Sequence, residues 1–242
     1  MRKDGQSTKE KILEAAAKLF SENGFQDTTV SDICVYANTN IASVNYHFGS
    51  KESLYREVWK LAFDMSLKEY PIDGGLAEDA PAEDKLRAFV KAILFKILDG
   101  GKIGYYGKLF IIEAGDINPI IQDLKSEHIA IIRRRLRSIL SELLGPRASE
   151  DDIGLCHFSV INQCLALAFK LSILNSRKIQ DGNTQLFKDF PMPFHKWTLP
   201  ENIDQLAEHI TDFSLAGISQ VRNRLEKSQP KSSTSFARAA KG

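Results

Sequence analysis

Residues 28–54 read TTVSDICVYANTNIASVNYHFGSKESL, and this stretch has the start and stop signals of two short helices joined by a tight turn. Thr28 or Thr29 can cap a helix that extends to about Ala37, because threonine side chains accept hydrogen bonds from the free amides at a helix start. Asn38-Thr39-Asn40 is a turn, since these residues favour turns and caps over helix interiors.

A second helix is expected from Ile41 to about Phe48. Gly49 ends it, because glycine suits the left-handed position after a helix, and Ser50 can cap the helix that follows. The stretch therefore predicts a helix-turn-helix spanning roughly Thr29 to Phe48.

Helical spacing of apolar residues continues on both sides of this motif. A preceding helix can begin at a cap formed by Ser7 or Thr8 and end at Asn23-Gly24. The acidic, Gly- and Pro-rich segment Pro71–Pro81 interrupts the pattern. The helices expected outside the motif are 7–23, 50–70, 83–99, 102–114, 118–144, 149–176 and 201–227.

The resulting fold class is all-α, with a small N-terminal helix-turn-helix domain and a larger helical domain. The expected boundaries are 1–70 for the first domain, 71–227 for the second, and 228–242 for a disordered tail. This tail has three basic residues and no acid, so it either adds non-specific DNA affinity or is a passive solvated end. Residues 180–200 lack a helical pattern and are expected to be irregular.

Composition sets limits on function without deciding it. The chain has 242 residues, 43% of them hydrophobic and 26% charged, with a formal net charge of +1. Its three cysteines, Cys34, Cys156 and Cys164, do not suggest a disulfide framework and fit a reducing cytoplasm. No signal peptide or membrane-spanning run is recognisable, so we expect a cytoplasmic protein.

The distribution of acids is more informative than their number. No carboxylate occurs between Asp32 and Glu52, although about a quarter of the chain is charged. A surface that faces phosphates must avoid carboxylates, because uncompensated repulsion lowers affinity at every contact. This window covers the turn and the whole second helix of the motif, and it indicates a nucleic-acid interface.

The second helix also has side chains suited to the major groove of DNA. Asn can pair with adenine, Ser can reach base edges or phosphates, and small apolar groups can touch thymine methyls. Lys51 and Thr29 lie at helix starts, where they can contact phosphates. The DNA-binding residues expected are Thr29, Ile41, Ala42, Ser43, Asn45, Tyr46, His47 and Lys51.

Two of these assignments have an alternative. Tyr46 could pack in a three-helix core instead of contacting phosphate, and Asn45 could be a solvated surface amide. Val44 and Phe48 are expected to be core residues.

Residues 8–54 resemble the DNA-binding domain of the TetR family. The residues that carry the resemblance are Ala16-Ala17, Leu19-Phe20, Gly24, Thr28-Thr29, Ile33, Ala37 and the string YHFGSKESL at 46–54. Asn38 replaces the usual turn glycine, and Asn tolerates left-handed geometry. Asn45 replaces a usual tyrosine, which changes the expected base contacts. Residues 40–48 resemble a CecR-like subgroup.

The resemblance implies a homodimeric repressor on a near-palindromic operator, released by a small-molecule effector that tilts the helix after the motif. In the family, the last two long helices form the dimer. The residues that fit this role, or else belong to the monomer core, are Phe158, Ile161, Leu165 and Phe169 on one helix and Ile210, Phe213, Gly217 and Val221 on the other.

The larger domain is expected to bind an unknown effector in a largely apolar pocket. The candidate lining residues, which could equally be core, are Tyr105, Tyr106, Phe110, His128, Phe169 and Trp197.

Other kinds of site are weakly supported. Cys156 and Cys164 are about 12 Å apart along a helix, too far for one zinc ion. His128 with Glu113 and Asp116 could suggest catalysis, but no nucleophile or phosphate loop accompanies them. We therefore expect no metal, no cofactor and no enzyme activity. A dimeric DNA-binding module without small-molecule sensing is the second hypothesis.

Overall fold

Strong capping residues and apolar stripes of helical spacing build an all-helical chain, as the sequence predicts. The computed structural model describes the backbone of residues 3–98, 104–112, 118–175 and 202–227, and within these the side chains of residues 8–166 and 202–227. The helices are α1 (Lys3–Asp27), α2 (Val30–Tyr36), α3 (Ile41–Phe48), α4 (Lys51–Glu69), α5 (Ala82–Leu98), α6 (Tyr105–Ile112), α7 (Pro119–Leu144), α8 (Glu150–Asn175) and α10 (Ile203–Lys227).

The helix boundaries agree with the sequence where local caps decide them. Pro119 is the first residue of α7, and Ser149 exchanges hydrogen bonds with Asp152 at the start of α8. The first helix differs from expectation: α1 begins at Lys3, so the predicted cap at Ser7 or Thr8 is wrong. Gly24 has a left-handed φ of 79°, as predicted, but the helix resumes after this kink and extends to Asp27. The irregular segment 180–200 and the tail 228–242 lie outside the described residues.

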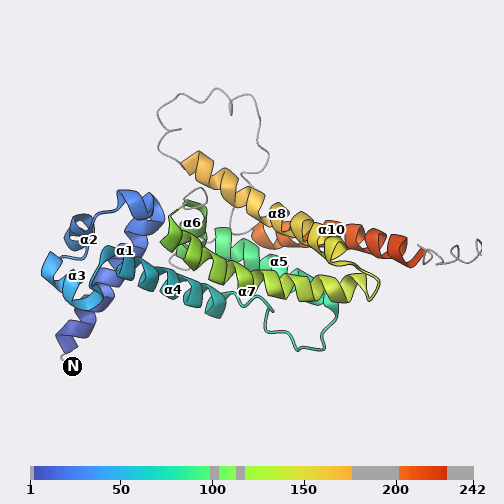
Figure 1. Ribbon diagram of the computed structural model, residues 1–242, viewed down its shortest axis with the longest axis horizontal. Coiled ribbons are helices and arrows are strands. Elements are labelled where there is room, and N and C mark those ends of the chain that lie inside the picture. The colour runs from blue at the N-terminus through green and yellow to red at the C-terminus, as the bar shows by residue number, and fades with distance from the viewer. Residues whose placement is uncertain (1–2, 99–103, 113–117, 176–201, 228–242) are drawn as a thin grey trace, which may run out of the picture.

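Two hydrophobic clusters hold the helices together. The first contains α1–α4 and also, from beyond the acidic Gly/Pro segment, Tyr106 and Leu109 of α6 with Ile121 and Leu124 of α7. The second joins α5, the later part of α7, α8 and α10. In Figure 1, α1–α3 form one end of the molecule, and α4 leads from them towards the bundle of α5, α7, α8 and α10.

α6 connects the two clusters by a close approach to α5. A Cβ placed on Gly107 would lie 2.5 Å from the carbonyl oxygen of Lys96 and 2.8 Å from Cα of Ile97. Only glycine lets the two backbones come this close. The first cluster is therefore anchored on the bundle through α6.

Candidate nucleic-acid interface and buried aromatic cluster

Side chains at each helix start fix the geometry of the α2–turn–α3 segment. Thr29 and Asp32 form a capping box on α2, with Asp32 N donating to Thr29 Oγ1 at 3.1 Å. Asn38 has a φ of 49°, the left-handed turn expected of asparagine. Asn40 caps α3 by accepting from Ser43 N at 2.9 Å, and Ser50 caps α4 by accepting from Ser53 N at 3.1 Å.

The α3 helix presents one face to the core and one to solvent. Val44 and Phe48 are buried in the first cluster, as predicted. Tyr46 is 85% exposed, so the alternative that it packs in the core is wrong. The solvent side, called here the α3 face, consists of Ile41, Ala42, Asn45 and Tyr46, with Ser43 and His47 half-buried at its edges.

Two predicted phosphate contacts have other partners in this structure. The Thr29 hydroxyl donates to Asp32 Oδ2 at 2.6 Å, so its proton is not available for the phosphate contact predicted from the sequence. These hydrogen bonds lower the pKa of Asp32, which keeps its carboxylate ionised beside α2. The Lys51 ammonium lies over the Phe25 ring, 4.4 Å from its centroid.

Two lysines of α1, missed in the sequence analysis, also lie beside the motif. Lys9 Nζ is 5.5 Å from the centroid of the Phe48 ring, and Lys18 Nζ donates to the Tyr36 hydroxyl at 2.9 Å. Contact with aromatic rings holds such cations in place while they stay exposed to anions. Together with Lys51, they place three positive charges against aromatic residues of the helix-turn-helix domain, at Phe48, Tyr36 and Phe25.

Four of the predicted effector residues lie around one aromatic cluster between α4, α6 and α7. His128 stacks on Phe63, with ring centroids 3.9 Å apart and an interplanar angle of 8°. Tyr106 contacts both rings, at 5.2 Å from Phe63 and 5.8 Å from His128, and Trp59 packs edge-on to Tyr106 at 5.8 Å. Phe110 lies 6.3 Å from Tyr106. These five residues form the aromatic cluster; Tyr105 is half-buried beside the same core.

The sequence analysis missed Trp59 and Phe63, although a signal was available. Tyr55, Trp59 and Phe63 recur every four residues of α4, which places all three on one face of the helix. Phe169 and Trp197, the other two predicted effector residues, lie outside the described side chains.

The aromatic cluster contains buried polar atoms without partners. Trp59 Nε1, the Tyr106 hydroxyl and His128 Nδ1 have no hydrogen-bond partner in the described part of the chain. Burial raises the pKa of Tyr106, so the phenol stays protonated. Burial lowers the pKa of His128, opposed by the charges of Glu127 and Asp64, so the imidazole is neutral near pH 7. Buried polar groups are usually paired, and three unpaired groups at one place are unusual.

A buried lysine lies next to this cluster. Lys96 of α5 is 1% exposed and donates to the backbone carbonyl and the hydroxyl oxygen of Ser66 on α4. Burial lowers its pKa to about 7. Ser66 Oγ in turn donates to the carbonyl of Phe63 at 2.8 Å, which links the lysine to the aromatic cluster through α4.

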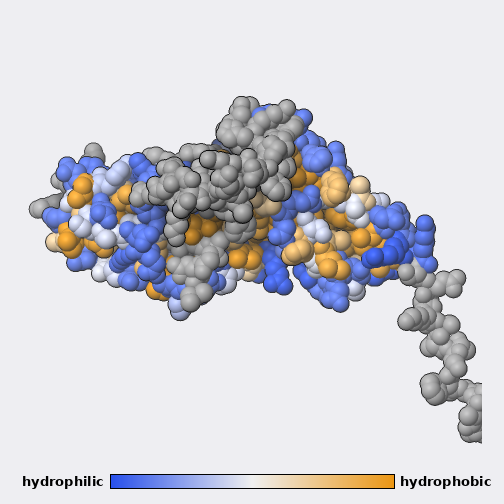
Figure 2. Space-filling model, turned by 90° about the horizontal axis from the view of Figure 1, so that it is seen from above, coloured by the Kyte–Doolittle hydropathy of each residue, from blue (hydrophilic) through white to orange (hydrophobic). Residues whose placement is uncertain are grey.

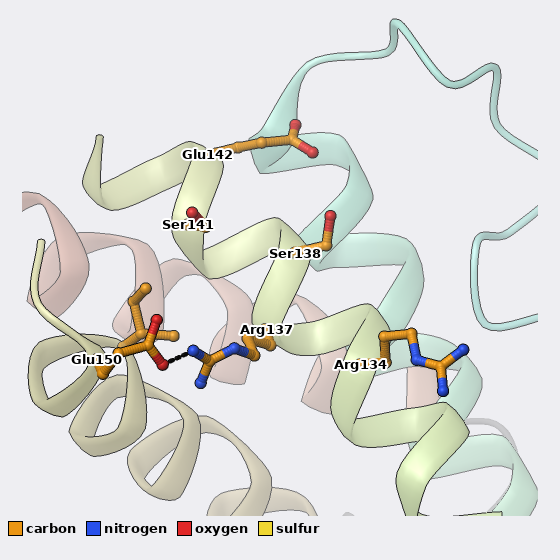
Figure 3. A pocket seen from close by; sticks show the side chains of 7 residues that line it. Arg134, Arg137, Ser138, Ser141, Glu142 and Glu150 are labelled. Atoms are coloured by element: carbon orange, nitrogen blue, oxygen red, sulfur yellow. Dashed lines mark ion pairs between the residues drawn. The ribbon is translucent and has the colours of Figure 1, made fainter. Parts of the chain in front are cut away.

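The groove drawn in Figure 3 is unlike the expected effector pocket. It lies along α7 and the start of α8 and is lined by Arg134, Arg137, Ser138, Ser141, Glu142, Glu150 and Ile153. Arg137 pairs with Glu150 in this view, while the Arg134 side chain points away from that pair. The groove is open and carries charges of both signs.

The residues predicted at the dimer interface separate into two groups. Phe158 and Phe213 are 67% and 66% exposed, and Gly217 is also exposed, with no atom within 4 Å of the position that a Cβ would occupy. Ile210 is 4% exposed in the second cluster, so the structure corrects its assignment to the interface: it is monomer core. Ile161, Leu165 and Val221 are half-buried, and the side chain of Phe169 is not described.

Leu155 extends this exposed apolar surface by one turn of α8 and was not predicted. Leu155, Phe158 and Phe213 are called here the α8–α10 stripe. Figure 2 shows apolar residues among hydrophilic ones over the part of the molecule that contains α8 and α10.

Within the described helices, none is long and apolar enough to cross a membrane. The described residues also contain no group of three or more His, Cys, Asp and Glu side chains arranged to hold a metal ion. Cys156 and Cys164 are buried thiols whose pKa values burial raises.

Comparison with known families divides the chain at the acidic Gly/Pro segment, whereas the first hydrophobic cluster crosses it to include α6 and the start of α7. Residues 12–58 match the family described as bacterial regulatory proteins, tetR family. Residues 82–183 match the C-terminal domain of the HTH-type transcriptional dual regulator CecR.

Among curated proteins, the chain is similar to the biofilm operon icaADBC HTH-type negative transcriptional regulator IcaR of Staphylococcus aureus (strain Newman). The two are 46% identical over 56 residues, which cover 23% of this chain and 30% of that protein. IcaR of Staphylococcus epidermidis is 39% identical over 74 residues, covering 27% of this chain and 40% of that protein. The chain thus matches only about a third of the length of these relatives.

Solved structures resemble the chain over most of its length. A TetR transcriptional regulator from Chloroflexus aurantiacus superposes with a TM-score of 0.61 at 18% identity, covering 90% of this chain and 98% of that one. AibR, solved in complex with isovaleryl coenzyme A and operator DNA, superposes with a TM-score of 0.60 at 16% identity, covering 85% and 97%. At these identities the likeness concerns the fold.

Proposed function

We propose that this chain, which belongs to the TetR family and has a CecR-type C-terminal domain, is a cytoplasmic repressor. It binds a near-palindromic operator as a homodimer, and a small-molecule effector releases it. One observation carries the proposal: the α3 face is exposed, free of carboxylates and fixed by caps at both ends. The name of IcaR as a negative regulator supports repression. AibR, solved with both isovaleryl coenzyme A and operator DNA, supports the binding of DNA and a small-molecule effector by one protein.

DNA reading is assigned to α3. Two α3 helices of a dimer would enter successive major grooves, about one helical turn or somewhat more apart. Asn45 is exposed with a free amide in the described structure, and it would pair with one base edge. Lys9, Lys18 and Lys51 would contact phosphates without reading sequence.

The DNA proposal is tested by fluorescence anisotropy on a duplex from the region upstream of the protein's own gene. Asn45→Ala should cost about 1–3 kcal/mol at one base step, whereas Asn223→Ala, an exposed asparagine of α10, should cost nothing. Lys51→Ala should weaken binding to all sequences and lower the salt slope by about one per subunit, with Lys227→Ala as its control. Unchanged affinity and salt dependence for Lys51→Ala would refute the docking geometry.

The α8–α10 stripe supports the dimer. Large exposed apolar side chains gathered on two neighbouring helices mark an interaction surface, and Gly217 on the same face of α10 allows a close approach. Phe158→Lys and Phe213→Lys should each shift sedimentation equilibrium towards monomer, while Leu76→Lys, at an exposed leucine outside the stripe, should not. Monomeric parent protein would rule out the stripe as a dimer interface.

Release by an effector requires that a change in the second domain be transmitted to α3. The α4 helix can transmit it, because it contacts the second domain and follows α3 directly. Arg56 of α4 pairs with Asp123 of α7 at 3.2 Å, and Trp59 and Phe63 bring α4 into the aromatic cluster. A ligand that changes this packing would tilt α4, alter the spacing of the two α3 helices and lower operator affinity.

The alternative is a dimeric DNA-binding module that senses no small molecule. It predicts that no compound releases the operator, so a screen of small molecules for loss of operator anisotropy distinguishes the two. We propose no catalytic activity, because His128 stacks on Phe63 instead of facing a nucleophile. Glu113 and Asp116, the acids considered with it, lie outside the described residues.

A further inference from the structure

The buried polar groups around α4 share one chemical property: they are mostly hydrogen-bond donors. The ammonium of Lys96, the indole N–H of Trp59 and the hydroxyl of Tyr106 can all donate. The Trp59 indole and the Tyr106 hydroxyl have no acceptor in the described structure. His128 Nδ1 has no hydrogen-bond partner there either. Lys96 has three N–H bonds, of which Ser66 receives at most two. Among the described residues, donors therefore remain without acceptors at this site.

Within the described residues, no negative charge pairs with Lys96. Lys96 forms no ion pair within the described residues, whereas Lys85 of the same helix, also buried, pairs with Glu142 at 2.8 Å. Burial is the single cause of the lowered pKa of Lys96, and no carboxylate opposes it. Asp64 and Glu127, whose charges act on His128, are themselves exposed. An unpaired buried charge is costly and is normally retained only where a partner meets it.

A chain of contacts connects Lys96 to the aromatic cluster. Ser66 accepts hydrogen bonds from Lys96 and follows Phe63 by three residues. It therefore lies about one helical turn, roughly 5 Å, along the same face of α4. The Phe63 ring lies against His128 and Tyr106. Gly107, next to Tyr106, lies against the backbone of Lys96.

We propose that the effector is an organic acid, whose carboxylate accepts hydrogen bonds from Lys96 and its neighbouring donors and whose apolar body packs against the aromatic cluster. This inference rests on the proposed function and names the class of its effector. Binding would draw the Lys96 ammonium from the Ser66 carbonyl to the ligand. Because that hydrogen bond joins α5 to α4, its loss would free α4 to tilt.

Direct binding can be followed through Trp59. The chain has two tryptophans, so a Trp197→Phe variant leaves Trp59 as its single fluorophore of this kind. The probes are two matched pairs, benzoate with benzamide and octanoate with octanamide, titrated at pH 6.5 without DNA. We expect at least one acid to change Trp59 fluorescence with an affinity at least tenfold above that of its amide, and the better pair identifies an aromatic or aliphatic body.

Substitution of Lys96 separates charge recognition from packing. Lys96→Met keeps the length of the side chain and removes its charge, so it should weaken the acid at least tenfold and leave the amide unchanged. Lys60→Met, at an exposed lysine of α4, is the matched control and should behave as the parent.

A second readout does not depend on the variant folding. Above pH 7 the free protein progressively loses the Lys96 proton, while the acid requires it. The affinity of the parent for the acid should therefore fall with pH between 7 and 9, approaching tenfold per unit, and the affinity for the amide should stay constant. A merely structural lysine would give no such difference between the two probes.

The proposal is overturned if neither acid binds up to millimolar concentration, if acid and amide bind equally, or if the acid's affinity is independent of pH. Anisotropy on the same preparations separates this failure from that of the proposed function. Operator binding without Lys96-dependent acid binding refutes the acid effector alone. Lys96-dependent acid binding without any operator binding refutes the repressor.

Discussion

The α2–turn–α3 segment and the junction of α4 with α5, α6 and α7 satisfy their polar groups in opposite ways. In the first, Thr29, Asn40 and Ser50 each bond an amide three residues away, and the outward side chains meet solvent. In the second, Trp59, Lys96, Tyr106 and His128 come from four helices and are buried without a full set of partners. The first region presents a fixed surface, and the second is the region where we propose that an effector acts.

The largest expected effect tests whether the two regions share one core. Leu109 of α6 is fully buried in the cluster that contains α1–α4, although it lies beyond the acidic Gly/Pro segment. Leu109→Ala should lower the free energy of unfolding by about 2–5 kcal/mol. Because the same cluster supports α3, operator binding should be lost at a lower temperature as well.

Thermal denaturation followed together with anisotropy measures both effects. Leu76→Ala, at an exposed leucine, is the control. A variant that loses bundle stability while α1–α3 keep binding DNA at the parent's temperature would show two independent cores.

The next effect concerns the contact between α6 and α5. Gly107→Ala places a Cβ 2.5 Å from the Lys96 carbonyl oxygen, and both sides of the contact are backbone, so the helices must separate. We expect a loss of about 1–3 kcal/mol in urea denaturation. Gly154→Ala, in α8 with no atom within 4 Å of its Cβ, should instead gain up to about 1 kcal/mol from helix propensity. Equal effects of the two substitutions would mean that the close approach does not matter.

What could be predicted from the sequence follows this same division. Thr29 and Asn40 act through bonds to amides three residues away, and Asn38 and Gly49 through their own left-handed φ angles, so these identities predicted α2 and α3 correctly. Burial of Trp59 or Ile210 depends on residues far along the chain, which no local pattern specifies. The aromatic spacing in α4 was a usable signal, whereas the charge-free surroundings of Lys96 were visible in the structure alone.

The third prediction concerns the pH dependence of stability. Burial depresses the pKa of Lys96 to about 7 in the folded state, so between pH 7 and its ordinary value near 10.5 the unfolded chain binds the extra proton. The free energy of unfolding therefore rises with pH in this window, by at most about 1.4 kcal/mol per unit. Below pH 7 both states are protonated, and the cost of the buried charge is fully present.

Urea denaturation from pH 7.5 to 8.5 measures this slope, and comparison with Lys96→Met separates it from the cysteines, whose folded-state pKa values burial raises. Lys96→Met should remove the slope, and Lys60→Met should keep it. A slope that survives Lys96→Met would mean that another group titrates.

The smallest effect on stability separates the two roles of the first region. Asn40→Ala removes the cap of α3 and should cost about 1 kcal/mol. Asn40→Asp keeps an acceptor and adds a negative charge, which is favourable at a helix start, so thermal denaturation should show no loss.

The same charge breaks the carboxylate-free window beside the α3 face, so operator affinity should fall severalfold at low salt, with less difference at high salt because ions screen it. If Asn40→Asp binds the operator as the parent does, the absence of acids between Asp32 and Glu52 has no role in DNA binding, and the caps alone account for the composition of this region.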